Sequence, residues 1–132
     1  MKKSIGLNKI SISVARGDRG IEALLREVAG DVKSRVVDPG LSAFVFGDNT
    51  VLAAYESGAV HPDFLFEGGD VVLTFNVKDL QSAMAALQKE EAILLGSVER
   101  WGNNAFCHMR LKSGITVGLH ENGMVINDPP LR

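Results

Sequence analysis

The chain has 132 residues, and 45% of them are hydrophobic, which is enough for one domain with its own core. Its net charge is −2 and its basic residues are scattered singly, which argues against a nucleic-acid surface. A single cysteine, Cys107, excludes an internal disulfide and a CxxC metal or redox site. We expect this thiol to be buried in a strand and unreactive.

The N-terminal stretch MKKSIGLNKI lacks the apolar core of a signal peptide. No apolar run approaches the length that a membrane-spanning helix needs. The sequence therefore predicts a cytoplasmic protein whose partners include neither nucleic acid nor membrane.

A strand followed by an amphipathic helix is expected near the start. Residues 7–14 alternate between apolar and polar, which is the period of a half-buried strand. The following GIEALLREV carries apolar residues at helical spacing, namely Ile21, Leu24, Leu25 and Val28.

The same pattern returns after an offset of 63 residues. Residues 70–77 alternate as the first strand does, and Val77 corresponds to Val14. Asp79 then has the position and side chain of a helix N-cap, with Met84 and Leu87 on one face of the helix that follows.

Two hairpins complete the repeat, at residues 41–56 and 106–121, with Asp48-Asn49 and Ser113-Gly114 as their turns. Weaker strand signals precede them around 33–37 and 93–101. Each half therefore reads β-α-β-β-β, and an internal duplication of this kind predicts two similar sheets that share one core or cleft. We expect a single domain with module one at about 5–57, a connection at about 58–69 and module two at about 70–126.

The stretch VVLTFNVKDLQSAMAAL, followed after the expected gap by SGITVGLHE, resembles the vicinal oxygen chelate superfamily over nearly the whole chain. That superfamily includes glyoxalase I, extradiol dioxygenases, fosfomycin resistance enzymes and bleomycin resistance proteins. The usual Asp-Pro-Asp-Gly turn is replaced here by residues 111–114, of which only the glycine matches. The resemblance implies an α+β fold in which two βαβββ modules form a curled eight-stranded mixed sheet, a cup, with helices on the outer face.

Strand alternation divides this sheet into two faces, because residues two apart share a side. One set is wholly apolar and is expected to pack against the helices: Ile10, Ile12, Val14, Leu52, Ala54, Leu73, Phe75, Val77, Val117 and Leu119. The other set is mixed and would line the cup: Lys9, Ser11, Ser13, Val51, Ala53, Tyr55, Val72, Thr74, Asn76, Thr116, Gly118 and His120.

The resemblance places metal ligands at four positions of the cup, which here are Lys9, Ala53, Val72 and Gly118. None of these side chains suits a divalent metal. The chain therefore resembles the metal-free bleomycin resistance branch, whose members sequester a drug without transforming it, and we expect no cofactor and no catalytic residue. An alternative is a lyase, isomerase or dioxygenase with a shifted metal site around His120, drawing on His61, His108, Glu56 and Glu121.

We expect the cup to bind a small, partly apolar molecule, with an antibiotic as one candidate. The residues predicted to bind it are Tyr55, Thr74, Asn76, Trp101, Thr116 and His120. Tyr55 and His120 correspond after an offset of 65 residues, so good pseudo-symmetry would make them face one another. A third possibility is a cup filled by its own side chains, with a structural or interaction role. The apolar segment HPDFLF could serve as a dimer contact or swapped segment, and we expect a homodimer.

Overall fold

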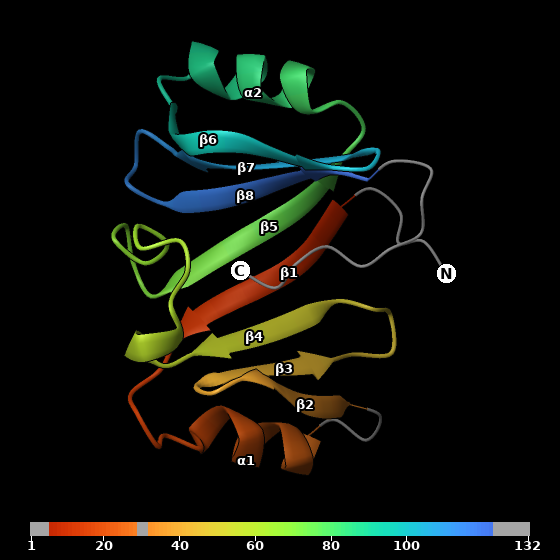
Figure 1. The fold of residues 1–132 in the computed structure, drawn as a ribbon, viewed down its shortest axis with the longest axis vertical. Coiled ribbons are helices and arrows are strands. Elements are labelled where there is room, and N and C mark those ends of the chain that lie inside the picture. The colour runs from red at the N-terminus through yellow and green to blue at the C-terminus, as the bar shows by residue number, and fades with distance from the viewer. Residues whose placement is uncertain (1–5, 29–31, 123–132) are drawn as a thin grey trace.

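The computed structural model describes residues 6–28 and 32–122, so residue 5 and residues 123–126 of the expected modules lie outside it. The elements follow the expected order, β-α-β-β-β twice, in an α+β fold (Figure 1). Module one contains β1 (Gly6–Ser13), α1 (Gly20–Val28), β2 (Lys33–Asp38), β3 (Leu41–Val45) and β4 (Val51–Tyr55). Module two contains β5 (Val71–Val77), α2 (Leu80–Lys89), β6 (Ile93–Trp101), β7 (Asn104–Arg110) and β8 (Thr116–Glu121).

All eight strands belong to one sheet, in the order β2-β3-β4-β1-β5-β8-β7-β6. The first strands of the two modules, β1 and β5, pair antiparallel at its centre, and each pairs in parallel with the last strand of its own module. The two modules are therefore related by an approximate twofold axis through the β1–β5 pair. Figure 1 shows α1 at the β2 end of the sheet and α2 at the β6 end.

Helix α2 begins as the sequence predicts. The carboxylate of Asp79 accepts hydrogen bonds from the backbone N–H groups of Gln81 and Ser82, which is the N-cap arrangement. Its apolar face, with Leu80 and Met84 buried, packs on β6, β7 and β8. The core cluster formed there contains Leu80, Met84, Ala92, Ala105, Cys107, Met109, Val117 and Leu119.

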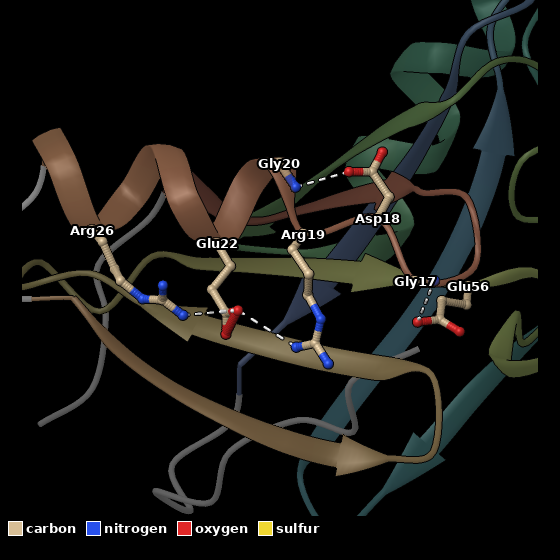
Figure 2. Close-up of polar contacts among 7 residues, drawn as sticks. All are labelled: Gly17, Asp18, Arg19, Gly20, Glu22, Arg26 and Glu56. Atoms are coloured by element: carbon tan, nitrogen blue, oxygen red, sulfur yellow. Dashed lines mark hydrogen bonds and ion pairs between the residues drawn. The ribbon is translucent and has the colours of Figure 1, made fainter.

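Helix α1 is held differently, through polar contacts at its start (Figure 2). Asp18 accepts a hydrogen bond from the N–H of Gly20 at 2.8 Å, and Glu22 lies 3.1 Å from Arg26. Such exposed ion pairs stabilise a fold by at most about 1 kcal/mol. Leu24 was expected on the apolar face of this helix, but 53% of it is exposed, so only part of that face is covered in the described residues.

The two faces of the sheet differ in burial as the alternation predicts, most clearly in module two. Val117 and Leu119 of β8 pack under α2 on the outer face. On the cup face, the side chains of Val72, Thr74 and Asn76 are at most 3% exposed. The outward residues of the central strands are half-buried instead, because the two helices lie at the ends of the sheet (Figure 1).

The connection, defined as residues 57–70, covers one end of the cup. It starts with a 3-10 turn at Ser57–Ala59 and inserts Leu65, which is 0% exposed, among Leu41, Ala53, Tyr55 and Val72. Its neighbour Phe66 lies edge-on to Tyr55, with ring centroids 5.6 Å apart. The segment HPDFLF thus packs inside its own chain.

In the part of the chain that the structure describes, neither helix is long and apolar enough to cross a membrane.

Candidate functional site

A row of cup-facing residues crosses four neighbouring strands at one level of the sheet. Lys9 of β1 pairs with Thr74 of β5, Thr74 with Gly118 of β8, and Gly118 with His108 of β7. We call these four residues the polar row. Residues paired in this way share a face of the sheet, so their side chains lie side by side over the floor of the cup.

Gly118 gives the row its shape. A Cβ at this position would stand 2.6 Å from the hydroxyl oxygen of Thr74 and 3.1 Å from its methyl carbon, so the Thr74 side chain lies directly over the glycine. Gly118 separates Thr74 from His108 along the row, and it contributes no side chain between them.

Three polar atoms of this region are fully enclosed and have no hydrogen-bond partner among the described residues. They are the hydroxyl oxygens of Ser11 and Thr74 and the Nε2 nitrogen of His108. Ser11 lies two residues from Lys9 on the same face of β1, and the three residues are 1%, 2% and 3% exposed. Buried polar groups are paired in the great majority of cases, so this grouping calls for an explanation.

Aromatic rings cover the His108 end of the row. Phe106 of β7 and Phe64 of the connection both meet the imidazole edge-on, with ring centroids 4.8 Å and 5.6 Å away. Phe64 also approaches β6, because a Cβ on Gly96 would lie 3.1 Å from its ring. The connection therefore closes the polar row from above.

One level further along the strands, His120 is the centre of a second arrangement. Its Nδ1 lies 2.9 Å from Oδ1 of Asn76, and its Nε2 lies 3.2 Å from Oδ1 of Asn104. The indole of Trp101 is stacked on it, with ring centroids 5.7 Å apart and planes within 2°. We call Asn76, Trp101, Asn104 and His120 the His120 group.

The environment keeps both cup histidines neutral. Burial lowers the pKa of His108 to about 4, and the positive charge of Lys9 acts in the same direction. Burial and Lys9 also lower the pKa of His120, against a smaller opposite effect of Glu121. A neutral ring carries one N–H, so His120 donates to one asparagine and accepts from the other, whose amide must present its NH2 group.

The six predicted ligand-binding residues separate into two places. Asn76, Trp101 and His120 are together in the His120 group, and Thr74 stands beside them in the polar row. Thr116 lies under the connection, where its hydroxyl accepts from Nε of Arg110 at 3.4 Å and a Cβ on Gly68 would approach it to 3.0 Å.

Tyr55 is the sixth residue, and it does not face His120. It pairs with Ser13 at one end of β1, whereas the level of His120 and Asn76 meets β1 at Gly6, seven residues away. At the usual rise of a strand this is roughly 20 Å. The expectation of a facing pair was wrong, because antiparallel β1 and β5 place equivalent residues at opposite ends of the cup.

The four positions at which the resemblance places metal ligands all lie on the cup face. Ala53 and Val72 flank Ser11 in the register, and both pack against Leu65 in one apolar cluster. Lys9 and Gly118 belong to the polar row. Leu65 therefore occupies space beside two of these positions, and neither Ala53 nor Val72 offers a donor atom to a metal.

The residues of the alternative metal site are dispersed. Glu121 accepts from the N–H of Leu80 at 2.8 Å, and Glu56 from the N–H of Gly17 at 3.5 Å (Figure 2). Both glutamates thus hold the start of the helix region in their own module. His61 is exposed in the connection, and within residues 6–28 and 32–122 no group of three or more His, Cys, Asp or Glu side chains could hold a metal.

Three residues that matter here were not among the predicted ligand-binding set: Ser11, Asn104 and His108. Alternation along FCHMR already separates Phe106 and His108 from Cys107 and Met109. Only the pairing of β7 with β8 shows that His108 shares the cup face with Gly118. Cys107 faces the core as expected, and burial raises its pKa to about 11, so the thiol stays protonated.

Comparison with known proteins rests on structure alone, because no family model and no curated protein matches the sequence. One solved structure, described as a glyoxalase/bleomycin resistance protein/dioxygenase superfamily member from Vibrio splendidus, matches with a TM-score of 0.60 and 9% identity. That match covers 90% of this chain and 100% of the other. Methylmalonyl-CoA epimerase from Mycobacterium tuberculosis matches with a TM-score of 0.55 and 20% identity, over 88% of this chain and 87% of that one.

A third match is a variant of methylmalonyl-CoA epimerase from Streptomyces coelicolor in complex with 2-nitronate-propionyl-CoA. Its TM-score is 0.53 and its identity 17%, over 89% of this chain and 98% of the other. Identities this low establish the fold alone. The chain has the fold of the glyoxalase/bleomycin resistance protein/dioxygenase, or vicinal oxygen chelate, superfamily.

Proposed function

We propose that this protein binds a small, partly apolar molecule in the cup, without a metal ion and without transforming it. The observation that carries the proposal is the set of three buried polar atoms without a partner, on Ser11, Thr74 and His108. Burying such an atom unpaired costs about 1–3 kcal/mol, so a ligand that satisfies all three gains that free energy on binding.

The surroundings of these atoms supply apolar contact. Phe64 and Phe106 flank His108, and Trp101 lies beside them over His120. Ligand sites commonly combine an apolar wall with a few polar groups that orient the molecule. A protein of the same fold binds an organic ligand, 2-nitronate-propionyl-CoA, which supports a similar use of the fold here.

Entry requires the connection to move, because the three polar atoms are enclosed and Phe64 lies against His108. The connection packs on the cup by side chains of its own, chiefly Leu65 and Phe66. A ligand that binds under it would hold it down and stabilise the folded chain by mass action. An antibiotic held in this way would be sequestered, which is the resistance role that the resemblance implies.

A metal-dependent enzyme with its site at His120 is the competing function, and the contacts of His120 disfavour it. Both ring nitrogens already face asparagine side chains, so a metal would have to displace one of them. Glu121 is held at the start of α2.

The test compares melting temperatures of chelator-treated wild type and Thr74→Val, which keeps the shape and removes the hydroxyl. We expect the variant without ligand to be more stable by about 1 kcal/mol, because an unpaired buried hydroxyl is gone. Its melting temperature should then rise less than that of wild type with an organic ligand found by screening small aromatic and aliphatic compounds.

Ser97→Ala, at an exposed position of β6, is the control and should behave as wild type in both respects. A rise in melting temperature with Mn, Fe, Ni or Zn salts and with no organic compound would contradict the proposal. An equal ligand response in Thr74→Val and wild type would remove Thr74 from the site.

A further inference from the structure

We propose that the ligand of the cup is a small organic monoanion, a carboxylate, and that the ammonium group of Lys9 replaces a metal ion as the positive charge that binds it. The inference rests on the function proposed above and assigns the chemical class of the ligand.

The position of Lys9 is the first reason. It stands at one of the four places where the resemblance puts a metal ligand, in the middle of β1, and is only 4% exposed. Lysine is among the residues least often found fully buried, since its charged form loses hydration there. A buried lysine in a cup marks a place where positive charge is used.

The reach of this charge is the second reason. Lys9 is separated from His108 by two strands, yet its charge lowers the pKa of His108 and of His120. Its field therefore extends over the polar row and the His120 group. Within the described residues, Lys9 is the sole charged side chain among the buried ones, and no buried aspartate or glutamate accompanies it there.

The hydrogen-bonding chemistry of the neighbours is the third reason. Ser11 and Thr74 have hydroxyls that can donate, and neutral His108 can place its proton on Nε2. Together with the ammonium group, these donors suit a ligand with several acceptor lone pairs. A carboxylate offers two oxygens with about four such sites and one negative charge, which matches both the donors and the single cation.

The charge balance separates a monoanion from other ligands. A neutral molecule would gain little from the field of Lys9, and a phosphate dianion would place one excess negative charge in an enclosed site. An unbalanced charge costs free energy in a medium of low polarity, which favours a ligand with a single negative charge. Serving as the cation with a side chain also removes any need for metal donors at Ala53 and Val72.

The experiment is calorimetric titration at pH 7 in the presence of chelator. The probes are a series of carboxylates, namely acetate, butyrate, hexanoate, benzoate and phenylacetate, each paired with its neutral amide, together with phenyl phosphate. We expect the carboxylates that bind to bind about tenfold to a hundredfold more tightly than their amides, which is the usual worth of a charge-assisted hydrogen bond.

Lys9→Met should abolish this preference, because methionine keeps most of the length of the side chain and lacks the charge. Lys78→Met, at an exposed position after β5, is the matched control and should keep the preference unchanged. If Lys9→Met fails to fold, Ser11→Ala is the second variant, with an expected loss of about tenfold in carboxylate affinity and little change for amides.

A second measurement uses wild type alone. A bound carboxylate beside His108 favours the charged ring, so NMR titration should show the pKa of His108 rising in the presence of the carboxylate and not of the amide.

The outcomes separate the inference from the proposed function. If amides bind as tightly as carboxylates, the cup is a binding site and the assignment of a monoanion is wrong. Tighter binding of phenyl phosphate than of any carboxylate also overturns it. If neither series binds and the His108 pKa never moves, both the inference and the proposed function fail.

Discussion

Thr74 on β5 lies so close to Gly118 on β8 that a Cβ on the glycine would stand 2.6 Å from the threonine hydroxyl oxygen. The backbone of Gly118 is not in the left-handed region, so this position requires glycine for space and not for conformation. The floor of the cup is therefore set by a contact between two strands in which one partner has no side chain.

Gly118→Ala should destabilise the protein by about 1–3 kcal/mol, the usual cost of overpacking a core. Thr74→Ala in the same chain should recover part of the loss, since it removes the two nearest atoms and leaves only its own Cβ at 3.2 Å. Urea unfolding of the two single variants and the double variant gives the coupling free energy. Gly58→Ala, where a Cβ meets nothing within 4 Å, is the control. Additive effects would show that the two side chains do not compete for the same space.

Leu65→Ala should cost about 2–5 kcal/mol, because the side chain is 0% exposed and its removal leaves a cavity between Tyr55 and Val72. The comparison is Val36→Thr, which changes a side chain that is 72% exposed and should cost about 0.5 kcal/mol or less. Denaturant midpoints measure both. A loss as small for Leu65→Ala as for Val36→Thr would mean that the connection is not packed on the cup in solution.

Tyr55→Ala and Trp101→Ala should separate stability from binding. Tyr55 is 0% exposed and packed around Leu65, so its truncation should cost about 3–5 kcal/mol. Trp101 is half-buried and stacks on His120, a contact worth about 1 kcal/mol, so its truncation should destabilise much less. We expect Trp101→Ala to lose ligand-induced stabilisation while remaining folded. The reverse ranking in thermal unfolding would contradict these placements.

Stability should fall as the pH is lowered from about 6.5 toward 4. The pKa of His108 is about 4 in the folded chain, whereas an unperturbed histidine has a pKa of 6.5, so the unfolded chain binds more protons in this range. Stability therefore rises with pH through this window, and His108 alone contributes about 3 kcal/mol across it. Urea unfolding at pH 7 and pH 5 measures the difference.

His108→Gln should flatten that pH dependence, and the lowered pKa of His120 leaves a smaller remainder of the same sign. His61→Gln, at an exposed position of the connection, is the control and should keep the full dependence. An unchanged slope in His108→Gln would show that this ring is not buried as a neutral group.

Local pattern was sufficient to predict the strands, the helices and the duplication. Alternation along residues 70–77, the N-cap at Asp79 and the two hairpins each depend on neighbours in sequence, which is the range over which such patterns act. Leu24 shows the limit of this reasoning, because helical spacing identifies an apolar face without showing how much of it is covered.

The candidate site was predicted in part, for a physical reason. Asn76 and His120 were identified because their strands pair in parallel and keep the same offset. His108 depends on the register of β7 against β8, and Tyr55 was misplaced because the direction of β1 relative to β5 cannot be read from either strand alone. The insertion of Leu65 into the cup follows from tertiary packing, to which a segment without periodicity gives no local signal.

A repeat of two copies has only one linker, and the connection is that linker. The two ends of the cup are equivalent in the duplicated framework, yet Leu65 and Phe66 cover the end that holds Tyr55 and leave the end that holds His120 to other contacts. Joining two identical units into one polypeptide therefore breaks their equivalence at once. Thereafter, substitutions in the first copy are constrained by packing under the linker, while the second copy is free to diverge toward recognition.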